Sequence, residues 1–98
     1  MKTINLETEN GIPMNVRLIE EGERYGEDNY LIHGKKEPLV QISLENHYMV
    51  SRFSLSKLEG IEYGHHMDVS NPEFYVGIES IRMILEWVGM VREYRNIA

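Results

Sequence analysis

The alternation of apolar and polar residues in segment 3–19, TINLETENGIPMNVRLI, constrains the fold more than any other feature of the sequence. A two-residue loop on its Asn-Gly pair would place apolar residues of one strand opposite polar residues of the other. A three-residue loop over 9–11 places every apolar residue on one face, as a half-buried sheet requires, with Gly11 at the left-handed position of a G1 bulge. This register pairs Thr8 with Ile12, Leu6 with Met14 and Ile4 with Val16.

Further segments have strand character. They are Tyr30–His33, Leu39–Leu44 and Met49–Leu55. A two-residue turn at 46–47 would connect the last two segments with their apolar residues on one face. That turn pairs Val40 with Phe53 and Leu44 with Met49. Pro13 points outward and lacks a backbone N–H donor, which indicates that its strand lies at the edge of the sheet.

Helical signals begin after these strands. Ser56 followed by Glu59 and then by Gly60 predicts a capping box and a stop, and therefore a single helical turn over 56–60. The strongest helix signal is the long apolar periodicity near the C-terminus. Pro72 suits the first position of that helix, which we expect to span 72–95.

These elements predict an α+β fold in a single domain, residues 1–98. The strands lie within 3–55, the helical turn at 56–60, a loop at 61–71 and the helix at 72–95. We expect a five-stranded antiparallel sheet, a meander of hairpins, with the long C-terminal helix packed on one face. The apolar face beneath the helix would contain Ile4, Leu6, Val16, Val40, Ile42 and Phe53.

Composition excludes several functional classes. The chain has no cysteine, which excludes disulfides, thiolate metal sites and a cysteine nucleophile. A formal net charge of −6 argues against direct binding of nucleic acid, which needs a basic surface. Residues 1–5 contain no apolar signal region, and no stretch approaches the roughly 20 apolar residues of a membrane span. We therefore expect a cytoplasmic protein that binds no cofactor, nucleic acid or membrane.

The segment YGHHMDVSNPE, residues 63–73, contains the most reactive combination of side chains. Neighbouring side chains of an extended segment point to opposite sides, so His66 shares a side with Asp68 and not with His65. His66 and Asp68 are therefore weak candidates for a metal site. Because zinc-binding, nucleophile-elbow and phosphate-loop motifs are absent, the segment is interpreted as a polar loop leading into the helix. We expect no catalytic, cofactor or metal site.

Negative charge is concentrated in residues 20–29. The carboxylates are Glu20, Glu21, Glu23, Glu27 and Asp28. Two interpretations remain open, a solvated loop and an acidic patch that faces a protein with a basic surface. Arg24 and Arg52 are candidates for binding an anion, but the acidic neighbours of Arg24 oppose that function.

The predicted C-terminal helix has two apolar stripes at 100° per residue. The stripe assigned to the sheet contains Phe74, Ile78, Ile81, Leu85 and Val88. The second stripe contains Val76, Met83, Trp87, Met90 and Tyr94. Since a helix on one sheet needs only one apolar stripe, the second is either left exposed or covered by loop 61–70, by the N-terminal edge or by another copy of the chain. Trp, Met and Tyr are enriched in protein contacts, so we predict a homodimer centred on Trp87 and Met83.

These patterns predict a small non-catalytic protein-binding module that self-associates through its C-terminal helix. The short, acidic and motif-free sequence suggests an accessory or inhibitor protein of a phage or mobile element, which would occlude a partner surface. One alternative is a small metal-dependent or acid/base enzyme centred on His66 and Asp68. Another is an acidic mimic of nucleic acid that blocks a DNA- or RNA-binding protein, although mimicry requires carboxylates spread over a whole face.

Overall fold

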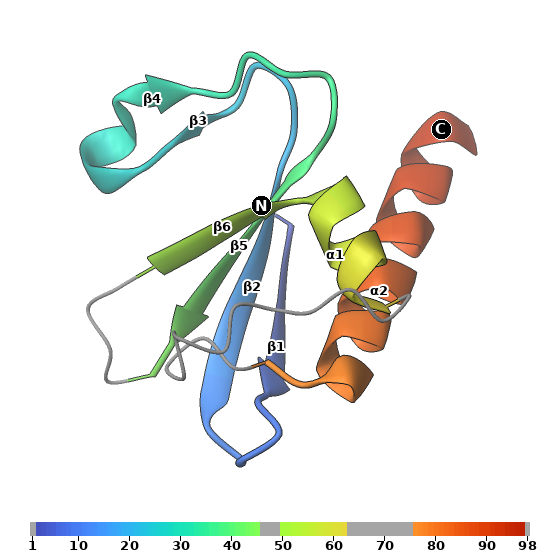
Figure 1. Cartoon of the computed structure of the whole chain (residues 1–98). Coiled ribbons are helices and arrows are strands. Elements are labelled where there is room, and N and C mark those ends of the chain that lie inside the picture. Colours follow the sequence, from blue (N-terminus) through green and yellow to red (C-terminus); the bar gives the residue numbers. More distant parts are fainter. Residues whose placement is uncertain (1, 46–49, 63–75, 98) are drawn as a thin grey trace.

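The computed structural model describes residues 2–45, 50–62 and 76–97 (Figure 1). These residues form strands, two α-helices and one short 3-10 helix. The strands are β1 (Thr3–Glu7), β2 (Pro13–Ile19), β3 (Arg24–Tyr25), β4 (Leu31–Ile32), β5 (Leu39–Leu44) and β6 (Val50–Ser54). The helices are η1 (Glu27–Asn29), α1 (Leu55–Glu62) and α2 (Ile78–Ile97).

The first hairpin has the predicted register. Ile4 lies opposite Val16 and Leu6 opposite Met14, and Gly11 adopts a left-handed φ of 81°. The three-residue loop is therefore confirmed. In the last hairpin Val40 lies opposite Phe53, also as predicted. The predicted pairing of Leu44 with Met49 lies outside the described residues.

The main sheet is antiparallel and has four strands in the order β1-β2-β5-β6. The prediction of five strands in one sheet is wrong, because β4 pairs with β3 in a separate two-stranded sheet and β5 pairs directly with β2. The edge-strand prediction for Pro13 is also wrong, since β2 is an inner strand. Pro13 is exposed and is the first residue of β2, where the missing N–H does not interrupt the ladder.

Residues 20–38, here called the arm, leave the sheet after β2 and return as β5 (Figure 1). The base of the arm is closed by backbone hydrogen bonds, from Gly22 N to His33 O at 2.8 Å and from His33 N to Glu23 O at 2.9 Å. Its tip turns through residues with positive φ, namely Gly26 (87°), Asp28 (60°) and Asn29 (55°). Asp and Asn tolerate this conformation better than most residues, and so the acidic loop forms a hairpin.

Helices α1 and α2 lie on one face of the four-stranded sheet (Figure 1). The strands contribute the buried residues Met14, Val16, Leu18, Val40, Ile42 and Leu44, and the helices contribute Leu58, Ile61, Ile81, Ile84 and Val88. Each such side chain stabilises the fold by about 1.5–3 kcal/mol relative to exposure. The predicted apolar face is confirmed, with Ile4, Leu6 and Phe53 only partly buried. Two helices cover the sheet, where the sequence predicted one.

Helix α1 is longer than the single turn predicted at 56–60. The hydroxyl oxygen of Ser54 accepts a hydrogen bond from the backbone N–H of Lys57 at 3.3 Å, which is the geometry of an N-cap. The predicted cap at Ser56 is therefore wrong by two residues. Gly60 does not end the helix, because packing of α1 on the core compensates for its low helix propensity.

Helix α2 begins later than the sequence predicted. Val76 and Gly77 are not helical, and Gly77 has a left-handed φ of 88° that interrupts any helix reaching it from upstream. The prediction of one continuous helix over 72–95 is thus wrong at these two residues. The predicted start at Pro72 lies outside the described residues.

Candidate functional site

The face of the sheet opposite the helices is polar and contains a row of paired residues. Thr3 lies opposite Arg17, Arg17 opposite Gln41, and Gln41 opposite Arg52, so the row crosses all four strands. Arg52 Nε donates a hydrogen bond to Gln41 Oε1 at 3.0 Å. Two arginines therefore flank one glutamine in this row, and the guanidinium group of Arg52 contacts its amide.

The arm is attached to the polar face through both arginines. Arg17 Nη2 donates a hydrogen bond to the backbone oxygen of Arg24 at 3.0 Å. The guanidinium carbon of Arg52 lies 5.2 Å from the centre of the Tyr25 ring, within the range of a cation–π interaction. Tyr25 also meets the ring of buried His33 edge-on, with centroids 6.2 Å apart. The arm is thus bound to the sheet by specific polar and aromatic contacts.

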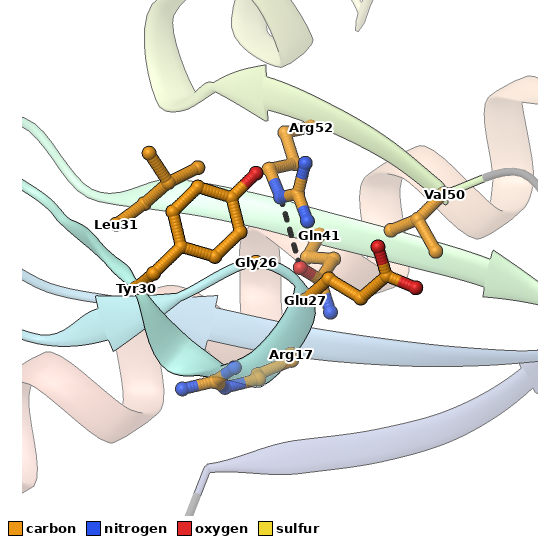
Figure 2. Close-up of a pocket in the computed structure, with 8 residues that line it drawn as sticks. All are labelled: Arg17, Gly26, Glu27, Tyr30, Leu31, Gln41, Val50 and Arg52. Atoms are coloured by element: carbon orange, nitrogen blue, oxygen red, sulfur yellow. Dashed lines mark hydrogen bonds between the residues drawn. The ribbon is translucent and has the colours of Figure 1, made fainter.

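A cleft of about 500 Å³ lies between the arm and the polar face (Figure 2). It is lined by Arg17, Gly26, Glu27, Tyr30, Leu31, Gln41, Val50 and Arg52. Figure 2 shows Glu27 and Tyr30 extending from the arm toward Gln41 and Arg52 of the sheet. The volume is typical of sites for small molecules.

The electrostatics of the cleft are set by its arginines. Arg17 Nη2 lies 3.8 Å from Glu23 Oε2, at the outer range of an ion pair. Arg17 Nε is buried and, within the described part of the chain, has no hydrogen-bond partner. A buried N–H without an acceptor costs about 1–3 kcal/mol. Glu27 is the carboxylate that lines the cleft, and its side chain is exposed.

The predicted acidic loop is the arm, and its carboxylates have different environments. Glu20 forms ion pairs with Lys2 and, at 3.7 Å, with Arg92 of α2. Glu23 lies 4.0 Å from Lys2 in addition to its contact with Arg17. Glu21, Glu27 and Asp28 are exposed. The first two carboxylates therefore connect the arm to Lys2 just before β1, to β2 and to α2, and the other three face solvent.

The second stripe of the predicted helix is only partly on the surface. Met83 is 49% and Met90 is 63% exposed, and Trp87 is half-buried against the core. Val76 precedes α2 and is fully buried, so it does not belong to this surface. The side chain of Tyr94 lies outside the described part of the chain. In the stripe assigned to the sheet, Ile81 and Val88 are buried as predicted, whereas Ile78 is 40% exposed. Ile84, which was not assigned to that stripe, is buried.

The histidine-containing loop lies outside the described residues, and with it the weak metal candidates His66 and Asp68. In residues 2–45, 50–62 and 76–97 no three His, Asp or Glu side chains are arranged to hold a metal ion. His33 is buried, and its Nε2 lies 2.7 Å from the backbone oxygen of Glu37. Because a carbonyl oxygen only accepts, this contact places a proton on Nε2 of His33.

Sequence reasoning considered Arg52 for anion binding but missed Arg17. Alternation within β2 is the signal for Arg17, because Arg17 lies two residues after Asn15 and therefore on the same polar face. Its position opposite Gln41 follows from the pairing of β2 with β5. Pairing of β2 with β5 is a long-range contact that local patterns do not specify. Arg24 remains exposed on the arm and contributes its backbone oxygen to the contact with Arg17.

No described helix is long and apolar enough to cross a membrane. The chain matches no model of a known protein family, and no curated protein or solved structure is significantly similar to it.

Proposed function

We propose that the chain is a cytoplasmic, non-catalytic protein-binding module that self-associates through α2. The exposure of Met83 and Met90 beside half-buried Trp87 supports this function; these three residues are called the α2 surface. Large apolar side chains that cluster on an exterior mark contact sites more often than scattered ones do. Met and Trp are also enriched at interfaces. The cysteine-free sequence is consistent with the cytoplasm.

The spacing of the two methionines favours a second copy of the chain as the partner. Met83 and Met90 are seven residues apart, about 10 Å along the helix. A two-fold axis near Trp87 would set Met83 of one antiparallel helix against Met90 of the other, so each contact would occur twice. Glu79, Arg82 and Glu86 flank the α2 surface on the exposed side of the helix, where opposite charges of two copies can face each other.

The exposed carboxylates of the arm support a further protein partner with a basic surface. Glu21, Glu27 and Asp28 face solvent, and their charge would accelerate association with such a partner. An accessory or inhibitor protein of a phage or mobile element that occludes this partner is the narrower form of the proposal. These three side chains support a partner whose surface is positively charged.

Sedimentation equilibrium tests self-association. Wild-type protein should have twice the 11.5 kDa mass of the chain at micromolar concentration. Replacing both Met83 and Met90 by Glu should yield the 11.5 kDa species, because two charges would be buried against their own copies. Ile78→Glu is the matched control, since Ile78 is exposed on α2 but lies away from the α2 surface.

Trp87 is a less suitable position for this test because it packs against the core, and Trp87→Glu would also disturb folding. The double methionine variant should keep its far-ultraviolet circular dichroism spectrum. A wild-type protein that remains monomeric at several hundred micromolar would contradict self-association. So would a double variant that dimerises as well as Ile78→Glu.

A further inference from the structure

We propose that the cleft between the arm and the polar face of the sheet binds a small oxyanion attached to a planar ring, of the size of a nucleoside monophosphate. This site is separate from the α2 surface, which belongs to a helix on the opposite face of the sheet (Figure 1). Three features of the cleft support this site. They are its two arginines, the buried Nε–H of Arg17, which lacks an acceptor in the described part of the chain, and the exposed ring of Tyr30.

Arg17 and Arg52 both line the cleft. They lie two strands apart in the same row, with Gln41 between them, so their backbones are about 10 Å apart. Side chains of this length can bring both guanidinium groups to a phosphate or carboxylate. Among the described residues, the hydrogen bond of Arg52 to Gln41 uses only Nε. The terminal nitrogens of Arg52 can therefore donate to a ligand, in the paired geometry that oxyanions favour.

The buried Nε of Arg17 indicates a missing acceptor at the other wall of the cleft. It has no hydrogen-bond partner within the described part of the chain, although Arg17 lines the cleft. Arg17 also donates through Nη2 to the arm, which fixes the orientation of its guanidinium group. An oxyanion that enters with a small displacement of the arm would supply the acceptor and remove the cost of the unpaired donor.

Three apolar or aromatic residues in the mostly polar lining of the cleft favour a ligand with a planar ring. Tyr30 is 66% exposed at the tip of the arm, and Val50 is 39% exposed on β6. Leu31 lies beside Tyr30 in the lining. Exposed aromatic rings such as that of tyrosine stack on bases in proteins that bind single-stranded nucleic acid. A volume of about 500 Å³ accommodates a ring and an oxyanion together.

Glu27 lines the same cleft, and its negative charge opposes the binding of an anion. Substitution of Glu27 is therefore a second test of the site, with an expected effect opposite to that of substituting Arg52. Removing this carboxylate should strengthen anion binding. Removing Arg52 should weaken it. The alternative is that the two arginines only attach the arm to the sheet, in which case neither change affects a ligand.

Titration calorimetry at low salt, with adenosine 5′-monophosphate, inorganic phosphate and adenosine as probes, tests the site. The monophosphate should bind most tightly, and adenosine at least about tenfold more weakly because it lacks the charge-assisted hydrogen bonds. Arg52→Gln should weaken monophosphate binding about tenfold. Glu27→Gln should strengthen it about two- to fivefold. Arg82→Gln, on exposed α2, is the matched control and should bind as wild type does.

Arg52→Gln also removes the cation–π contact with Tyr25. The melting temperature of Arg52→Gln therefore shows whether weaker binding comes from a destabilised fold. Glu27→Gln tests the same site without removing that contact. Equal binding of adenosine and its monophosphate would overturn the proposal, since the anion would not be recognised. Absence of binding at about 10 mM probe would overturn it as well, because that weak a contact falls below the affinity expected of a formed site. Monophosphate binding that is unchanged in both Arg52→Gln and Glu27→Gln would place the ligand elsewhere.

Discussion

The hydroxyl of Ser80 donates a hydrogen bond to the backbone oxygen of Glu7 at 2.6 Å, although 73 residues separate them in sequence. This contact joins the first turn of α2 to the end of β1. Ser80 is only 9% exposed, so the hydroxyl is a buried polar group with a specific partner. The bond fixes where α2 begins along the sheet.

Ser80→Ala should lower the free energy of unfolding by about 1 kcal/mol, because the Glu7 oxygen loses its donor. Urea denaturation measures this change as a lower midpoint at constant slope. Ser43→Ala, on the polar face of β5, is the control and should change stability by less than about 0.5 kcal/mol. Equal effects of the two substitutions would show that the Ser80 hydroxyl does not stabilise the α2–β1 contact.

Two glycines of the C-terminal region should respond oppositely to alanine. Gly77→Ala should lower the free energy of unfolding by at least about 1 kcal/mol, because φ is 88° and the new Cβ would lie 3.0 Å from Cβ of Glu9. Gly89 lies inside α2, and a Cβ added there would meet no atom within 4 Å beyond its own stretch of helix. Gly89→Ala should therefore raise stability by about 0.5–1 kcal/mol. Thermal melts of both variants at one concentration provide the comparison.

Glu20 and Glu21 are neighbours with different environments. Glu20→Gln should lower stability by about 1 kcal/mol, because its side chain is only 17% exposed and contacts both Lys2 and Arg92. Glu21→Gln should change it by less than about 0.5 kcal/mol, since Glu21 is exposed. Added salt should reduce the difference between the two variants. A difference that is absent at low salt would show that the arm is not held by Glu20.

Hydrogen bonds from the side chain and then the backbone of Ser56, with a smaller contribution from the charge of Lys35, lower the pKa of Glu37 below its ordinary value of 4.5. A carboxyl with a depressed pKa in the folded state stabilises the fold above its unfolded pKa. That stabilisation is lost as pH falls from the ordinary value of 4.5 through the lower folded value. Carbon-detected NMR titration should show the low pKa in wild type and a value nearer 4.5 in Ser56→Ala. An unchanged titration in the variant would contradict this assignment.

Local patterns predicted the hairpins of the main sheet. The pairing of Leu6 with Met14 follows from period-two alternation and from a turn that only a left-handed Gly11 completes. The same reasoning paired Val40 with Phe53. Strands that are adjacent in sequence have few alternative partners, and a slip of one residue would expose every apolar side chain.

Local patterns misplaced the starts of both α-helices. Ser56 and Glu59 resemble a capping box, yet α1 begins earlier because its position after β6 makes Ser54 the N-cap. Apolar periodicity extended the last helix through Val76, but Val76 is buried before α2 begins, and Gly77 has a left-handed φ of 88°.

The sequence by itself determined the α+β class, the first hairpin and the apolar face of the sheet, because these depend on side-chain periodicity and on turns of a few residues. Tertiary structure decided that the acidic segment folds back as a hairpin and leaves β2 beside β5. That pairing places Arg17 beside Gln41 and Arg52, and creates the cleft. Arg24 and Arg52 carry the same charge in the sequence, but strand pairing across the chain determines that Arg52 lines the cleft and Arg24 does not.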